Sequence, residues 1–384
     1  MESLSLENFI SLIIVFVSWL LIAFLLTAKT KNKTSNIILV LFLLVNAQDS
    51  SGIFASYFVY PKFPGWGMII NSTVFFKLPL LFLYIQSVIY NDFKFKKIYL
   101  LHLIPWILNI IVFIPRFFVV NFDEKWAFLE ATNYRELTEV RLSYIIIHIQ
   151  ILVYFIMSFM LIKKYKTLLL ENYTNASLFN FKWLFQLVFL FAVIAFIGTF
   201  KNMFLFLHLE TFLYYSQISV SLIALIFMCW IVLKALHSPE LFRGINSNLQ
   251  LVKNIVQEVG VISKKNGNES QEIIALKNYM QEEKPYLNAS LTIYDLSKEM
   301  DIPVRVLSLI INHDLNQHFF DFVNGYRIRN AMGILQDPEK KELTILEILY
   351  EVGFNSKSSF NTAFKKYTNL TPTQFREKAL KSVA

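Results

Sequence analysis

The distribution of apolar residues changes near residue 236. Before it, apolar residues form long runs that few charges interrupt; after it, they recur every three or four positions among polar residues. A run of roughly 20 apolar residues can cross the hydrocarbon core of a bilayer as a helix, whereas a spacing of three and four predicts an amphipathic helix. We therefore predict an all-α chain in which a transmembrane bundle precedes a helical domain outside the bilayer.

Seven apolar runs of membrane length occupy the first part of the chain. They cover residues 9–28, 36–59, 68–90, 98–114, 142–162, 183–200 and 212–233. Cytoplasmic loops of membrane proteins carry an excess of Lys and Arg, and the first, third and fifth loops hold ten such residues against six in the alternate loops. This asymmetry predicts a multi-pass protein of the bacterial cytoplasmic (inner) membrane, with its amino terminus outside and its carboxyl terminus in the cytoplasm.

Composition supports the membrane assignment. The 384 residues are 55% hydrophobic and include 38 Phe, and the mean hydropathy is +0.48, whereas soluble domains have a smaller apolar share. The chain starts with Glu2 and Glu7 and no basic segment, so the first run is predicted to be an uncleaved anchor rather than a signal peptide.

The chain divides into three predicted parts: a seven-span sensor domain (1–236), a juxtamembrane helix and linker (237–268) and a C-terminal domain (269–384). The juxtamembrane part carries an apolar stripe of Leu241, Ile245, Leu249, Val252, Val256 and Val259. Such a stripe is typical either of a dimerising helix that continues the last span or of one amphipathic helix lying on the membrane or on the bundle. The polar stretch 263–270 predicts a flexible linker.

Two opposite charges interrupt consecutive spans. Asp49 and Lys77 lie at matched depths, each about 20 Å from the cytoplasmic side at about 1.5 Å per helical residue. Charged groups are costly in a bilayer unless they pair or face an interior, so we expect an intramembrane pair. Other polar residues of the spans either bond neighbouring helices or line a cavity: His148, Gln150, Gln186, Lys201, Asn202, His208 and Gln217.

The C-terminal domain contains one motif twice. Leu291-Thr292-Ile293 and Leu343-Thr344-Ile345 each open a short apolar-spaced helix, which is followed by a break and a second helix. Thr is a favourable N-cap in both copies, Pro303 suits the first turn of a helix, and Gly353 can adopt the positive φ of a tight turn. We predict two helix-turn-helix units joined by a linking helix over Phe319–Gln336.

Residues of the linking helix and of the second copy carry a family resemblance. The segments 320–328 (FDFVNGYRI), 348–354 (ILYEVGF), 359–360, 364–367 (FKKY), 370–372 (LTP) and 375–376 resemble the DNA-binding domain of AraC/XylS-type transcriptional regulators, over about residues 270–380. The resemblance implies two recognition helices in successive major grooves of double-stranded DNA. It also makes RNA polymerase a candidate partner, since the family commonly acts near the polymerase site.

The resemblance implies particular contact residues. Bases would be contacted by Val304, Arg305 and Ser308 in the first recognition helix and by Lys357, Ser358, Asn361 and Thr362 in the second. Arg305 and Lys357 suit guanine and Asn361 suits adenine. Leu309 stands where a polar residue is common, so the first helix is expected to read bases more weakly. For any single residue, a solvated helix face is an equally good interpretation.

Positive charge is local rather than general in this domain. Residues 268–384 hold 14 basic and 15 acidic side chains, but basic residues gather around the second unit. Contacts to phosphate are therefore expected there, from Lys365, Lys366, Arg376 and Lys378.

Other classes of function lack sequence support. Phosphate-binding Gly-rich loops, Gly-x-Ser-x-Gly, His-Glu-x-x-His and Cys-x-x-Cys are missing, so we expect neither an enzyme nor a cofactor or metal site. The sequence predicts a membrane-tethered transcriptional regulator, with a homodimer as the simplest active form and a small-molecule or membrane signal as its input. The alternative is a receptor or transporter-like bundle whose helical tail binds a protein.

Overall fold

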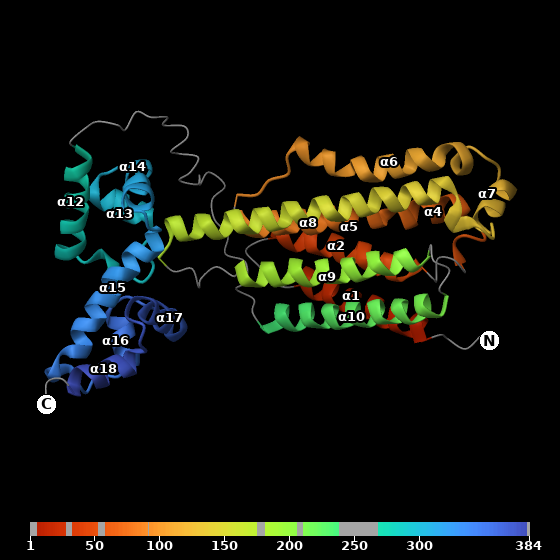
Figure 1. Ribbon diagram of the computed structural model, residues 1–384. Helices are drawn as coiled ribbons and strands as arrows, with labels where there is room; N and C mark the ends of the chain where they lie inside the picture. Colours follow the sequence, from red (N-terminus) through yellow and green to blue (C-terminus); the bar gives the residue numbers. More distant parts are fainter. Residues whose placement is uncertain are drawn as a thin grey trace. The chain divides into compact units, whose positions relative to one another are not determined.

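The computed structural model describes residues 6–27, 33–52, 58–90, 92–174, 181–205, 210–237 and 268–381, and these form helices throughout (Figure 1). Across these ranges the one β-type pairing is an isolated bridge between Tyr173 and Thr292. Contacts divide the chain into two compact units. Unit 1 comprises Met1–Ile162 and Asn180–Ser247, and unit 2 comprises Lys163–Phe179 and Asn248–Ala384.

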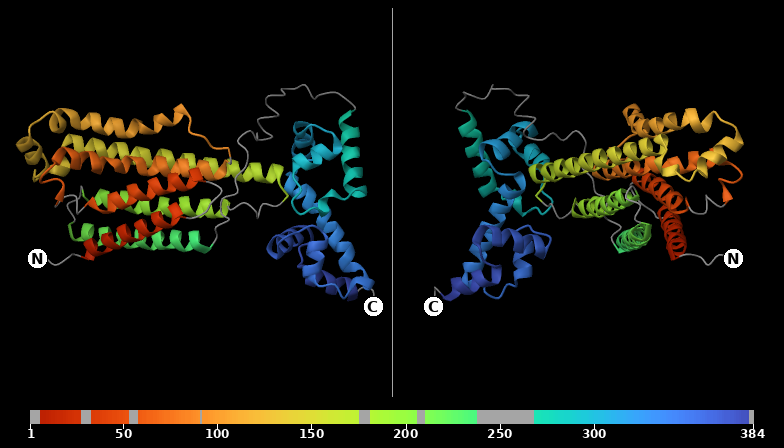
Figure 2. Two further views of the ribbon diagram at one scale, coloured as in Figure 1. Left: turned by 180° about the vertical axis from the view of Figure 1, so that it is seen from behind. Right: turned by 45° about the vertical axis from the view of Figure 1, so that its right-hand side comes forward.

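Unit 1 is a bundle of long apolar helices. Its main elements are α1 (Leu6–Thr27), α2 (Lys33–Ser50), α4 (Pro64–Ser72), α5 (Lys77–Ile89), α6 (Ile104–Phe113), α7 (Phe122–Leu129), α9 (Phe181–Leu205), α10 (Glu210–His237) and the first part of α8 (Thr138–Asn172). Within the bundle α1 lies against α2 and α10, α2 also contacts α5, and α10 contacts α9 (Figure 2).

Six helical segments, not the seven expected, are long and apolar enough to span a membrane in the part of the chain that the structure describes. They are Leu6–Thr27, Pro64–Ile89, Lys97–Phe118, Thr138–Asn172, Trp183–Asn202 and Thr211–Ile231. The run predicted at 36–59 is the exception. Its helix α2 is only 18 residues long and begins and ends on polar residues, the last of them Asn46, Gln48, Asp49 and Ser50, so too little of it is apolar.

Large apolar side chains are exposed on the outer faces of these helices, among them Phe16, Trp19, Leu152, Met160 and Phe196, each at least half exposed. Exposed apolar surface on this scale marks a surface that meets lipid or another apolar partner rather than water. Polar side chains instead bond between helices. Ser35 Oγ donates to the Ser87 carbonyl at 3.1 Å, and Ser143 Oγ donates to Asn109 Oδ1 at 2.6 Å.

A break separates α4 from α5. Thr73–Phe76 forms a 3₁₀ turn ahead of Lys77. Pro79 has no N–H to give the carbonyl four residues earlier, which is that of Phe75. Gln150 Nε2 of α8 donates to this carbonyl at 2.8 Å. A buried glutamine therefore satisfies the main-chain acceptor that the proline leaves open, as apolar surroundings require.

Unit 2 contains seven α-helices from α12 to α18 and a π-helical turn after α14. They are α12 (Asn268–Glu282), α13 (Ile293–Met300), α14 (Val304–Leu309) with the π-helical turn Ile310–Asp314, α15 (Phe319–Gln336), α16 (Ile345–Glu351), α17 (Lys357–Thr368) and α18 (Pro372–Lys381). The long helix α15 has the bounds predicted for the linking helix, and this prediction is confirmed. The predicted juxtamembrane stripe from 241 to 259 and most of the linker lie outside the described residues.

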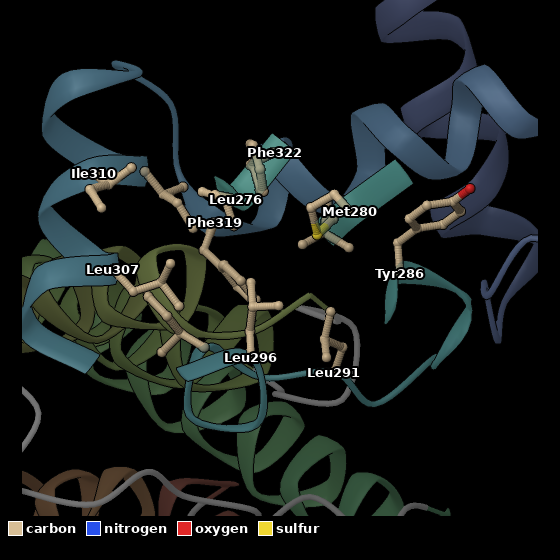
Figure 3. Packing of buried hydrophobic residues seen from close by; sticks show 12 residues of the cluster. Leu276, Met280, Tyr286, Leu291, Leu296, Leu307, Ile310, Phe319 and Phe322 are labelled. Atoms are coloured by element: carbon tan, nitrogen blue, oxygen red, sulfur yellow. The ribbon is translucent and has the colours of Figure 1, made fainter. Parts of the chain in front are cut away.

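Two hydrophobic cores lie along α15. Its first half contributes Phe319, Phe322 and Val323 to a core with α12, α13 and α14 (Figure 3). Its second half contributes Ile328, Ala331 and Leu335 to a core with α16 and α17. Because each helix-turn-helix unit packs on its own half of α15, this helix fixes the spacing between them.

The end of α8 belongs to unit 2. Thr174, two residues beyond the helix, donates through Oγ1 to the Leu291 carbonyl at 2.8 Å, and Tyr173 forms the bridge with Thr292. Asn312 Nδ2 lies 3.5 Å from the Glu171 carbonyl oxygen. The residues that precede α13 and the end of the first recognition helix therefore contact a segment that continues directly from a membrane-length helix.

Candidate nucleic-acid interface

The first helix-turn-helix unit begins with the predicted N-cap. Thr292 Oγ1 accepts from the Asp295 amide at 3.2 Å, and Asp295 Oδ2 accepts from the Thr292 amide at 2.9 Å. This reciprocal capping box satisfies two amides that the helix leaves open. The turn passes through Asp301, whose φ is 55°, and Pro303 is the N-cap of α14 rather than part of its first turn.

The second unit repeats this construction with a tighter turn. Thr344 caps α16 in a capping box with Glu347, and the main-chain and side-chain donors of Thr344 hold the pKa of the Glu347 carboxyl below its ordinary value. Gly353 has a φ of +90°, as the sequence predicts. Ser356 caps α17 by accepting from the Ser359 amide at 3.2 Å.

The turn at Gly353 is fixed by a close approach of the backbone. A Cβ atom on Gly353 would lie 2.5 Å from the Tyr286 carbonyl oxygen and 2.8 Å from that of Leu287. Only glycine fits this position, because both the positive φ and the neighbouring carbonyls exclude a side chain. The turn of the second unit is therefore held against the short helix Pro285–Leu287.

Helix α17 presents one polar face. Phe360, Ala363 and Phe364 are buried in the second core, whereas five predicted contact residues lie at or near the surface on the opposite side. Lys357, Ser358, Thr362 and Lys365 are exposed and Asn361 is half-buried. Their spacing of one and four places them along a single stripe of the helix, with the donors and acceptors that base edges and phosphates require.

Helix α14 presents a smaller polar face than the sequence predicts. Arg305 is exposed, but Val304 packs against the first core. Ser308 is buried at 4% exposure, and its Oγ and carbonyl both accept from Asn312 Nδ2. As placed here, Ser308 does not face outward as a base contact would. The first recognition helix therefore has fewer side chains that can read bases than the presence of Leu309 alone suggests.

Two of the predicted phosphate contacts form bonds within the domain. Lys366 Nζ lies 2.6 Å from Asp321 Oδ1 and joins α17 to α15. Arg376 Nη2 donates at 2.7 Å to the Leu343 carbonyl, and its Nη1 lies 3.4 Å from that of Lys341. The guanidinium thereby binds α18 to the loop before α16. Lys365 and Lys378 remain exposed.

Arg327 holds a central position that sequence reasoning did not identify. Its guanidinium is 1% exposed and donates at 2.7 Å to the carbonyls of Tyr286 and Asn288, and at 3.1 Å to Asn324 Oδ1. Nη2 also lies 3.4 Å from Thr174 Oγ1. Burial lowers the pKa of Arg327 to about 10, because the cation is removed from water. The signal available in the sequence was its place within the 320–328 segment.

In unit 1, Lys77 Nζ lies 2.6 Å from Asp49 Oδ2, and their side chains are 19% and 39% exposed. The first residue of α5 thus forms an ion pair with the end of α2, on the two consecutive runs that the sequence singled out.

The C-terminal region is similar to known regulators. A family model described as a helix-turn-helix domain matches residues 296–378. The HTH-type transcriptional regulator YdeC of Bacillus subtilis is 30% identical over 87 residues, which are 23% of this chain and 29% of that protein. The Msm operon regulatory protein of Streptococcus mutans is 28% identical over 89 residues, 23% of this chain and 31% of that protein.

Two further relatives match the same region. The melibiose operon regulatory protein of Escherichia coli K12 is 27% identical over 88 residues, 23% of this chain and 28% of that protein. The C-terminal domain of AraT, a response regulator from Geobacillus stearothermophilus, is 27% identical in a match over 28% of this chain and 84% of that one, with a TM-score of 0.25.

These similarities identify the C-terminal region as an AraC-type helix-turn-helix domain, and its relatives are transcriptional regulators rather than enzymes. The resemblance seen in the sequence is confirmed for this region. In each of these three regulators from curated sequences, the matched region is less than a third of the protein's length.

Proposed function

We propose that this protein is a one-component transcriptional regulator of the bacterial cytoplasmic membrane. The bundle of unit 1 senses a signal within or across the bilayer, and the helix-turn-helix domain binds promoter DNA on the cytoplasmic side. The observation that carries the proposal is the presence, in one chain, of six helices of membrane length and an AraC-type DNA-binding domain.

The polar face of α17 is the proposed main DNA contact. Lys357 donates to guanine O6 and N7, and Asn361 pairs with adenine. Lys365 and Lys378 contact phosphate groups. Helix α14 supplies Arg305 in an adjacent major groove. Since Ser308 is buried and Val304 is half-buried against the first core, specificity resides mainly in the second unit.

Helix α8 is the proposed route from signal to DNA-binding domain. It is continuous over 35 residues, from Thr138 to Asn172, and the residues that follow bond to Leu291 and Arg327. Leu291 precedes α13, and Arg327 lies on α15, which both cores share. Movement of α8 would therefore act directly on the helix that sets the spacing of the two recognition helices. Two tethered domains on one promoter would also gain effective concentration as a homodimer.

The test is genome-wide occupancy by the intact, membrane-inserted protein. We expect discrete sites for the native chain and for a Lys298→Ala control, an exposed lysine of α13, and loss of those sites for the Lys357→Ala, Asn361→Ala variant. If the native protein enriches no sites, the tail binds a protein rather than DNA and the proposal fails.

A further inference from the structure

Unit 1 encloses a cavity of about 570 Å³ between α1, α2, α5, α8, α9 and α10. This volume lies in the range of small-molecule sites, which combine mostly apolar walls with a few polar groups. Apolar residues from five helices form much of the walls, among them Ile14, Phe42, Ile147, Ile194 and Phe227. A molecule that fills this space must therefore have an apolar body.

The polar groups of the cavity come from residues that the sequence singled out as scattered. His148, Gln150, Lys201, Asn202 and Gln217 of that set all line it, and Asn46 lines it as well. Gln186 does not and is exposed on α9, and His208 lies outside the described residues. Gln150 already donates to the Phe75 carbonyl, and Asn46 Nδ2 contacts Met228 Sδ. Polar capacity for a ligand is therefore concentrated at Lys201, Asn202 and Gln217.

Charge in the cavity wall is unevenly paired. Lys77 and Asp49 both line the cavity and form an ion pair with each other. Lys201 instead donates through Nζ to Oε1 of Gln217, a neutral amide. Across the described ranges, no carboxylate lies within ion-pair distance of Lys201. Lys201 is half-buried, and a cation that is partly removed from water is stabilised most by a charged acceptor, so Lys201 would gain from an anion.

A second cavity shares this cation. About 470 Å³ in volume, it is lined by Lys201, Asn202 and Gln217 together with Arg135, Tyr214 and one acid, Glu7. Lys201 and Glu7 are the charged residues that line both cavities, and Arg135 adds a second cation in the wall of the 470 Å³ cavity. An anionic group is favoured there, whereas the 570 Å³ cavity beyond it favours apolar atoms.

We propose that the cavity binds a small amphiphile with one anionic group, which sits between Lys201 and Arg135 while its apolar chain lies along Phe42, Ile147 and Ile194. This inference rests on the proposed function, because the bound amphiphile is a signal only if the protein regulates transcription. Helix α8 contributes Tyr144, Ile147 and His148 to the cavity, so occupancy bears on the same helix that contacts the DNA-binding domain.

The test uses the full chain in nanodiscs of zwitterionic phosphatidylcholine, with octanoate as the probe and octanol as its neutral counterpart. Isothermal titration should give octanoate at least tenfold tighter binding than octanol. Lys201→Gln should remove this difference, and Lys62→Gln, an exposed lysine outside the cavity, should retain it. Equal binding of the two probes, or unchanged octanoate binding in Lys201→Gln, would overturn the proposal.

A second arm identifies the source of the anion. Anionic phosphatidylglycerol in the disc should leave octanoate binding unchanged if the ligand comes from solution, and should compete with it through Lys201 if the ligand is a lipid. Either result supports an anion-binding site at Lys201. Promoter binding is measured separately in the same discs, so loss of DNA binding refutes the proposed function, whereas DNA binding without preference for octanoate refutes the ligand site alone.

Discussion

The α-carbon of Gly353 faces the carbonyl oxygen of Tyr286 so closely that a Cβ atom would lie 2.5 Å from it. The same carbonyl accepts from Arg327 Nε at 2.7 Å. The turn of the second helix-turn-helix unit and the central arginine therefore share one acceptor, and the geometry of each restricts the other.

Replacing Gly353 by Ala should loosen the second unit. The positive φ alone costs about 1–3 kcal/mol for a residue with a side chain, and the contact with Tyr286 adds to this. Hydrogen exchange of α16 and α17 amides in the full chain should accelerate accordingly. Gly333→Ala is the matched control, since nothing lies within 4 Å of its Cβ position on α15, and it should stabilise by about 0.5–1 kcal/mol. Equal protection in both variants would contradict this account.

Base recognition should depend on α17 more than on α14. Asn361→Ala should cost about 1–3 kcal/mol on the preferred sequence and relax selectivity at one base pair. Arg305→Ala should have a smaller effect on selectivity, because its neighbour Ser308 is buried and Val304 is half-buried. Binding to a library of DNA sequences measures both. A larger loss for Arg305→Ala would assign specificity to the first helix instead.

Lys365 should act on affinity and not on sequence preference. Lys365→Ala should weaken binding to all sequences alike and reduce the slope of log K against log salt concentration by about one. Fluorescence anisotropy over a salt series provides the slope. Lys298→Ala, on α13, should leave it unchanged, and an unaltered slope for Lys365→Ala would remove this lysine from the phosphate contacts.

Acid should weaken the cap of α16 selectively. The pKa of Glu347 is lowered by donors from Thr344, so near and below its ordinary value of 4.5 the unfolded chain binds more protons than the folded chain. The cap's contribution is therefore present at neutral pH and lost as the pH falls through the lowered pKa. Exchange of α16 amides between pH 3 and 6, corrected for intrinsic rates, should reveal it. Glu347→Gln keeps an acceptor without titrating and should abolish this dependence.

The ion pair of Lys77 with Asp49 should make a single variant less stable than the double variant. Lys77→Met leaves the Asp49 carboxylate without its partner, and we expect a loss on the order of 1–3 kcal/mol, reduced by the partial exposure of the pair. Lys77→Met with Asp49→Asn should recover most of that loss. Thermal unfolding in nanodiscs measures it, and a double variant no better than the single one would deny the pair any energetic role.

Local signals in the sequence predicted the helix-turn-helix domain well. The N-caps Thr292 and Thr344, the turn at Gly353 and the bounds of α15 each depend on a few neighbouring residues. Among the described residues the membrane-length helices number six rather than seven, because the polar ends of α2 were included in an apolar run. Periodicity alone does not reveal where a helix stops.

Contacts between distant residues escaped prediction. Arg327 and Arg376 both bond to main-chain carbonyls, of Tyr286 and Asn288 in one case and Leu343 in the other. A carbonyl is present at every position, so no residue type marks its role as an acceptor. The bond of Arg376 to Leu343 was therefore not predicted. The burial of Ser308 was also not predicted, because it depends on packing between helices rather than on helical spacing.

Unit 2 is assembled from two stretches of chain separated by two membrane-length helices. A fragment that begins at residue 268 would lack Thr174, and with it a partner of the Leu291 carbonyl and of Arg327. Cleavage after the last span would thus yield a damaged domain rather than an independent one. Residues 163–174, joined by a short artificial linker to residues 268–381, form the smallest piece that retains these bonds, and production of the domain for crystallography should start from it.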